Sequence, residues 1–229
     1  FVFWRCIDLV HSCRKITLAF VLTVLMMCGE VAGAAEKPVV WGTTTIIGEM
    51  LRMVGGEAIE AHTLIPPRSC PGHFDLSPGD AVRLAGARLM LRHDFQAYLD
   101  HRLTAQNPEL ELEVISTGGQ VILPEAYLRG MKRLFDILCG RYPELADTFK
   151  ANHNRAIQQV HRSAAKALEH AGRSGLKGLP VLGSMKQQGL LRWLGFEVVA
   201  TFSNSPDELS VRKLAELLNS ARNREIAFA

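Results

Sequence analysis

Short apolar runs alternate with amphipathic stretches along most of this chain. Residues 38–42 are apolar enough for a buried strand, and residues 46–54 then repeat apolar positions on one face of a helix that Gly55 and Gly56 end. The same alternation predicts strands at 57–64, 88–91, 110–115, 179–183, 196–202 and 226–228, and helices at 77–85, 94–103, 125–139, 143–171, 185–194 and 206–219. Alternating strands and helices are typical of an α/β fold with parallel sheets flanked by helices.

The longest helical pattern divides the chain. A helix of this length would reach about 40 Å at 1.5 Å per residue, which suits a connection between two lobes better than a cover for one sheet. We therefore predict an N-terminal α/β lobe at 35–142, a long linking helix at 143–172 and a partial C-terminal α/β lobe at 173–229. Residues 225–229 read as a strand that has just begun, so we expect the second lobe to be incomplete.

The first residues have the three parts of a secretory signal peptide. Arg14 and Lys15 are basic, residues 16–28 form an apolar run, and residues 32–34 form a small-x-small cleavage site. The run is too short for a comfortable membrane span. We predict that residues 1–34 are a cleaved signal peptide, with an uncleaved anchor helix as the alternative.

Charge and motifs exclude several functions. The formal net charge is +3, and no block of Lys or Arg suggests nucleic-acid binding. The chain contains no nucleophile elbow, dinucleotide-binding glycine motif or phosphate-binding loop. We therefore expect a binding protein and not an enzyme.

Only two cysteines would remain after removal of the signal peptide. Cys70 and Cys139 could form one disulfide, or either could keep a free thiol for metal. Cys139 shares a predicted helix with Leu134 and Ile137, which favours a buried core thiol. Cys70, in a loop rich in turn-forming residues, is the better candidate for chemistry.

Several motifs resemble one family of proteins. They are Thr43-Thr44-Thr45-Ile46-Ile47, Gly55-Gly56, Leu64-Ile65-Pro66-Pro67, Phe74-Asp75-x-Ser77-Pro78-x-Asp80, and Gly195-Phe196-Glu197-Val198-Val199 followed by Ser205-Pro206. Together they resemble the periplasmic metal-binding (zinc/manganese-type) solute-binding proteins of ABC transporters, over residues 38–229. The resemblance implies two lobes on a rigid linking helix, and capture of zinc or manganese in the periplasm. It also implies a monomer that delivers its metal to an ABC transporter membrane permease.

The family's metal ligands are replaced in this chain. Gly72, Gln120 and Ser184 stand where the resemblance places three histidines, and the acidic fourth position would lie beyond residue 229. One interpretation is that the metal site has moved. The alternative is that the fold has lost its metal site and binds another small ligand or a protein partner.

Other residues could form a replacement site. Cys70 and His73 lie three residues apart on one loop, and His93 directly follows a predicted strand at the carboxyl edge of the same sheet. Thiolate and imidazole together suit zinc, or copper in its reduced state. We predict that Cys70, His73 and His93 bind a divalent transition metal, zinc first, and that Asp75 and Asp94 ligate or orient the imidazoles.

Three further histidines lie on the predicted linking helix. His153, His161 and His170 are separated by eight and nine residues, spacings that only loosely share a helical face. We interpret all three as solvent-exposed.

Overall fold

The computed structural model describes residues 36–203, 210–224 and 226. The predicted signal peptide at 1–34 lies outside the described residues, as does most of the strand expected at 226–228. None of the helices in the described residues is long and apolar enough to cross a membrane.

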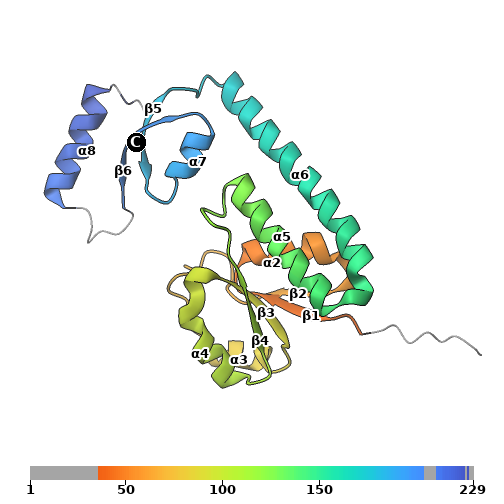
Figure 1. The fold of residues 1–229 in the computed structure, drawn as a ribbon. Helices are drawn as coiled ribbons and strands as arrows, with labels where there is room; N and C mark the ends of the chain where they lie inside the picture. Colours follow the sequence, from red (N-terminus) through yellow and green to blue (C-terminus); the bar gives the residue numbers. More distant parts are fainter. Residues whose placement is uncertain (1–35, 204–209, 225, 227–229) are drawn as a thin grey trace, which may run out of the picture. The chain divides into compact units, whose positions relative to one another are not determined.

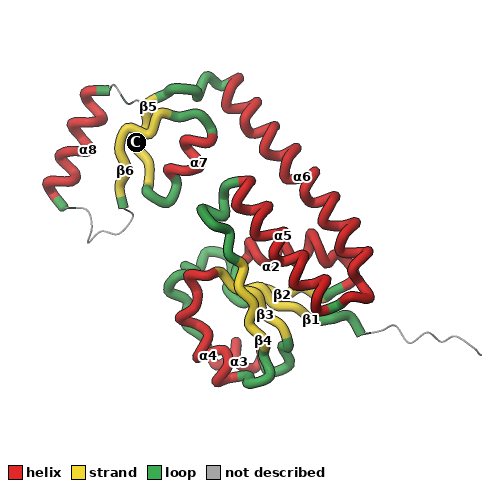
Figure 2. The backbone as a smooth tube through the Cα atoms, viewed as in Figure 1, coloured by secondary structure: helices red, strands yellow, loops and turns green. Residues whose placement is uncertain are grey.

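Four parallel strands form the first sheet (Figures 1 and 2). They are β1 (Val39–Gly42), β2 (Glu60–Thr63), β3 (Leu89–His93) and β4 (Glu111–Ile115), in the order β2-β1-β3-β4. The chain leaves β1 toward β2 on one side and returns to place β3 on the other side. The strand order therefore reverses between β1 and β3, and ligands of open α/β sheets bind at such a switch point, beyond the carboxyl ends of the strands.

Helices cover both faces of this sheet, as Figure 2 shows. One face carries α2 (Thr45–Gly55), α5 (Pro124–Arg141) and α6 (Ala146–Arg173); the other carries α3 (Pro78–Leu84), the 3₁₀ segment η2 (Asp94–Leu99) and α4 (Asp100–Gln106). Successive strand residues alternate between the two cores: Val40 packs with the first set, and Trp41 with the second. The predicted α/β fold with parallel sheets flanked by helices is confirmed.

The local signals that begin and end the helices act as expected. Ser77 caps α3 by accepting from the Asp80 backbone N–H, and the Asp80 carboxylate accepts from the Ser77 backbone N–H in return. Thr44 caps α2 through the backbone N–H of Ile47. Gly56 ends the same helix with a φ of 55°, a conformation that glycine adopts without strain.

The predicted long helix begins with a 3₁₀ turn, η3 (Pro143–Leu145), and continues as the 28-residue helix α6. At 1.5 Å per residue α6 is about 42 Å long. Its buried side chains lie mostly near the start, at Phe149, Asn152, His153 and Ala156. This i, i+3, i+4, i+7 pattern is the core-facing stripe of an amphipathic helix.

His153 is not solvent-exposed, and our interpretation of it was wrong. Only 6% of it is exposed, and its ring stacks on Phe135 at 4.6 Å between centroids. Our interpretation considered only the spacing between the three histidines. It left out the apolar residues that lie on the same face of the helix as His153. His161 and His170 are exposed, as expected.

The second sheet has two parallel strands, β5 (Pro180–Ser184) and β6 (Glu197–Phe202). Helices α7 (Gln188–Trp193) and α8 (Val211–Asn223) accompany them. Helix α7 begins later than predicted because residues 185–187 form a turn. Helix α8 begins at Val211, where the Ser210 hydroxyl caps it by accepting from the Lys213 backbone N–H. Residues 206–209 of the predicted helix lie outside the described residues.

Candidate metal centre

A cavity of about 570 Å³ opens at the carboxyl edge of the first sheet, where the strand order reverses. All three predicted ligands line it, together with residues of two other loops. The lining residues are Cys70, Pro71, Gly72, His73, His93, Asp94, Phe95, Thr117, Gly119, Gln120, Val121, Ile122 and Lys186. The cavity is the place at which this topology would hold a ligand.

Cys70 and His73 form a pair on one wall of this cavity. Cys70 Sγ lies 3.5 Å from His73 Nδ1, and the His73 backbone N–H donates to the Cys70 carbonyl over 3.2 Å, which closes the turn between them. With Zn–S of about 2.3 Å and Zn–N of about 2.0 Å, two corners of a zinc tetrahedron lie about 3.5 Å apart. The pair therefore has the spacing of one edge of a tetrahedral zinc site.

Neither described cysteine forms a disulfide. Cys70 is exposed and free, and Cys139 is free and partly buried. Desolvation by burial raises the pKa of the Cys139 thiol, with the Asp136 carboxylate adding to the effect and Lys132 opposing it. Cys139 packs against the core beneath α5, as predicted.

Tyr98 clamps the turn that carries the pair. Its hydroxyl donates to the Pro71 carbonyl over 2.8 Å and accepts from the Phe74 backbone N–H over 3.2 Å. Gln96 donates a longer hydrogen bond, of 3.4 Å, to the same carbonyl. Asp75, expected to serve an imidazole, pairs instead with Arg102. These contacts fix the Cys70–His73 turn at Pro71, and the two residues after it, to η2 and α4.

His93 ends β3 and forms the buried part of the cavity. It is 3% exposed, and its Nε2 lies 3.0 Å from the Thr44 hydroxyl at the start of α2. Its ring stacks on Phe95. Desolvation by burial lowers the pKa of His93, against a smaller opposite effect of the Asp94 carboxylate. The imidazole is therefore neutral at pH 7, with one nitrogen engaged by Thr44.

The described residues contain no group of three or more His, Cys, Asp or Glu side chains arranged to hold a metal ion. Cys70 and His73 come together as predicted, and His93 lies in the same cavity without completing such a group. Asp94 also lines the cavity, but its carboxylate accepts from the Phe95 backbone N–H and from the Ser116 hydroxyl. Metal binding by His93, as a third ligand beside Cys70 and His73, therefore stays a prediction.

The three residues that replace the family's histidines lie in or near this cavity. Gly72 and Gln120 line the cavity. The Gln120 amide donates to the Met185 carbonyl over 3.4 Å, and its oxygen is buried without a hydrogen-bond partner. Ser184 is 2% exposed and accepts from the Lys186 backbone N–H. Lys186 is the charged residue in the lining that the sequence did not predict, since no local pattern distinguishes it from other lysines.

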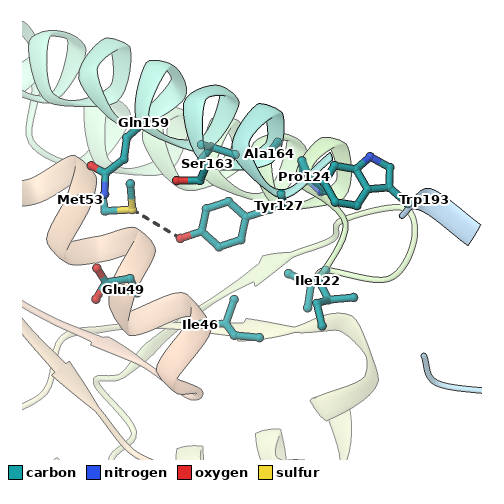
Figure 3. A pocket seen from close by; sticks show the side chains of 13 residues that line it. Ile46, Glu49, Met53, Ile122, Pro124, Tyr127, Gln159, Ser163, Ala164 and Trp193 are labelled. Atoms are coloured by element: carbon teal, nitrogen blue, oxygen red, sulfur yellow. Dashed lines mark hydrogen bonds between the residues drawn. The ribbon is translucent and has the colours of Figure 1, made fainter. Parts of the chain in front are cut away.

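A second cavity, of about 510 Å³, has a different chemistry (Figure 3). Helices α2, α5 and α6, the loop residues Val121 and Ile122, and Trp193 of α7 supply its walls. Tyr127 reaches across it and donates to Met53 Sδ over 3.5 Å. Its one charged lining residue, Glu49, forms an ion pair with Arg52 at 2.9 Å. The described residues that line this cavity include no Cys or His, so the first cavity is the candidate metal centre.

Comparison with known proteins gives matches over nearly the whole described chain. A family profile described as "Zinc-uptake complex component A periplasmic" (ZnuA) matches residues 40–229. A crystal structure of ZnuA aligns with a TM-score of 0.69 at 14% identity, covering 83% of this chain and 80% of that one.

Two metal-bound structures align similarly. The manganese-bound periplasmic metal-binding protein of Candidatus Liberibacter asiaticus has a TM-score of 0.69 at 14% identity, with 83% of this chain and 77% of that chain covered. Zinc-bound AdcA of Streptococcus pneumoniae has a TM-score of 0.63 at 20% identity, with 84% of this chain but only 46% of that chain covered. At these identities the likeness is one of fold.

Proposed function

Because the chain belongs to the family of periplasmic zinc-uptake component A proteins, we propose that it captures a divalent transition metal for uptake. Zinc is the first candidate and manganese the second. Members of this family are periplasmic metal-binding proteins. We further propose that the chain is exported by cleavage of residues 1–34 and acts as a monomer. Its partner would be the membrane permease of an ABC transporter, with no chemical step on the protein.

The Cys70–His73 pair is the observation that supports this proposal best. A thiolate and a neutral imidazole are ligands that zinc prefers, and their spacing of 3.5 Å matches an edge of its tetrahedron. The pair lies in a cavity at the switch point of the sheet. Manganese prefers oxygen ligands, so this pair favours zinc over manganese.

Protons compete with the metal at both ligand atoms. Binding requires a deprotonated thiol and a neutral imidazole, so zinc affinity should fall as the pH is lowered. Unfolding measured in the same buffers without metal separates loss of ligation from loss of structure.

Elemental analysis of the protein, purified from the periplasm without a histidine tag, tests the proposal. We expect about one zinc per chain, lost in the Cys70→Ala/His73→Ala variant. The matched control is Cys139→Ala/His161→Ala, which removes the same two side-chain types away from the cavity and should retain the metal. Equal metal content in all three proteins would contradict the assignment of Cys70 and His73.

A second candidate function is the same fold with the metal site lost, binding another small ligand or a protein partner. The described residues bring no three metal-ligating side chains together, and the cavity of about 570 Å³ is large for a bare ion. A folded protein without metal, both as isolated and after dialysis against zinc, would favour this candidate.

A further inference from the structure

We propose that the site takes its metal as a chelate, in which a small anionic oxygen-donor molecule of the hydroxycarboxylate class completes the coordination of zinc. The proposal rests on the function proposed above, and concerns the chemical form of the bound metal. Three independent features of the cavity lead to it: the number of available ligands, the volume, and the charge.

The protein supplies too few ligands for a closed site. Cys70 and His73 provide two, whereas zinc in proteins is almost always four-coordinate. His93 has its Nε2 engaged by Thr44, and the Gln120 amide is held against Met185. Among the described residues no third metal-ligating side chain joins the pair. About two coordination positions are therefore left for a molecule that arrives with the metal.

The cavity has the volume of a small-molecule site. At about 570 Å³ it falls within the range of roughly 300–1,000 Å³ that is usual for organic ligands. Phe95, Val121 and Ile122 supply apolar walls beside the Cys70–His73 pair. A site for a bare ion encloses it with protein atoms, whereas these walls leave space for a molecule of several carbon atoms.

The charged groups that line the cavity favour an anionic ligand. Lys186 lines it with an exposed side chain, and its ammonium group takes part in none of the ion pairs among the described residues. Zinc and Lys186 together carry three positive charges, and a Cys70 thiolate with the Asp94 carboxylate carries two negative ones. Water ligands would leave this excess of one positive charge uncompensated, while a hydroxycarboxylate supplies negative charge and could accept a charge-assisted hydrogen bond from Lys186.

Equilibrium dialysis with radiolabelled citrate and zinc tests the inference on the full chain. Three mixtures are compared: zinc alone, citrate alone, and both in equal amounts. We expect citrate to be retained at about one per chain only when zinc is present, and zinc to be held at least about tenfold more tightly with citrate than without.

The Lys186→Ala variant should weaken retention of citrate by about tenfold or more, because a hydrogen bond to a charged group is lost. The matched control is Lys166→Ala, which removes an exposed lysine from α6 and should behave as the unmodified protein. Zinc held equally tightly with and without citrate, with no citrate retained, would overturn the chelate inference and leave the proposed function standing. Failure to retain either zinc or citrate would contradict the proposed function itself.

Discussion

The hydroxyl group of Tyr98 offers a direct test of how the metal-binding turn is held. Replacing Tyr98 with Phe removes one oxygen atom and leaves the ring in place. The change breaks two hydrogen bonds, to the Pro71 carbonyl and from the Phe74 backbone N–H. Pro71 lies between Cys70 and His73, and Phe74 directly follows His73, so the turn that carries the pair loses two anchors and keeps only the longer Gln96 hydrogen bond to Pro71.

The size of the effect follows from the two contacts. Each hydrogen bond contributes about 0.5–1.5 kcal/mol net. Tyr98 is 42% exposed, so water replaces part of the loss, and we take about 1–2 kcal/mol for the pair. The freed turn must be ordered again when metal binds, so this energy appears in the affinity. At 1.4 kcal/mol per factor of ten, zinc affinity should fall by about 5- to 30-fold.

Competition titration against a chromophoric zinc chelator measures this change. The control is Tyr127→Phe, which removes a hydroxyl from the second cavity, where it contacts Met53. Cobalt(II) can replace zinc to report the thiolate contact by its charge-transfer absorption. If Tyr98→Phe binds zinc within twofold of the unmodified protein while remaining folded, the turn does not depend on the clamp and the reasoning is wrong.

Three further predictions concern stability. Phe149→Ala removes a fully buried ring from the start of α6 and should lower the free energy of unfolding by about 3–5 kcal/mol in urea titrations. Ser77→Ala removes the cap of α3 and should cost about 1 kcal/mol, whereas Ser77→Asp should retain most of the stability. Desolvation by burial lowers the pKa of His153 below its ordinary value of 6.5, so the unfolded chain binds protons first and stability should fall as the pH drops below about 6.5. His153→Leu should reduce that slope between pH 7.5 and about 5.5; an unchanged slope would assign it to other groups, such as His93.

The order of strands and helices could be predicted because each signal is local. Apolar alternation marks the strands, and caps such as Ser77 and Gly56 depend on residues within one helical turn. Placement of Cys70 beside His73 was predictable for the same reason, since a turn of four residues brings them together. These features need no information about the rest of the chain.

The remaining features depend on contacts between distant residues. The Thr44 hydroxyl that engages His93 lies 49 residues away in sequence, and Gln120 meets Met185 across 65 residues. Lys186 reaches the cavity from the loop after β5. No periodicity records such pairs, because they follow from how strands and loops pack. The number of ligands at the site could therefore not be deduced from the spacing of the cysteines and histidines.

The uneven burial of α6 has a consequence for local unfolding. Its buried residues from Phe149 to Ala156 pack into the core, whereas residues 157–170 are partly buried or exposed, and several of them border the open cavity of Figure 3. A helical segment with few tertiary contacts opens at a lower free energy than the domain as a whole. Amide hydrogens in the first half should exchange with deuterium only on global unfolding, and those in the second half through smaller openings. The single helix α6 would thus contain a boundary between two cooperative units. The second sheet could then unfold on heating while the first sheet is still folded.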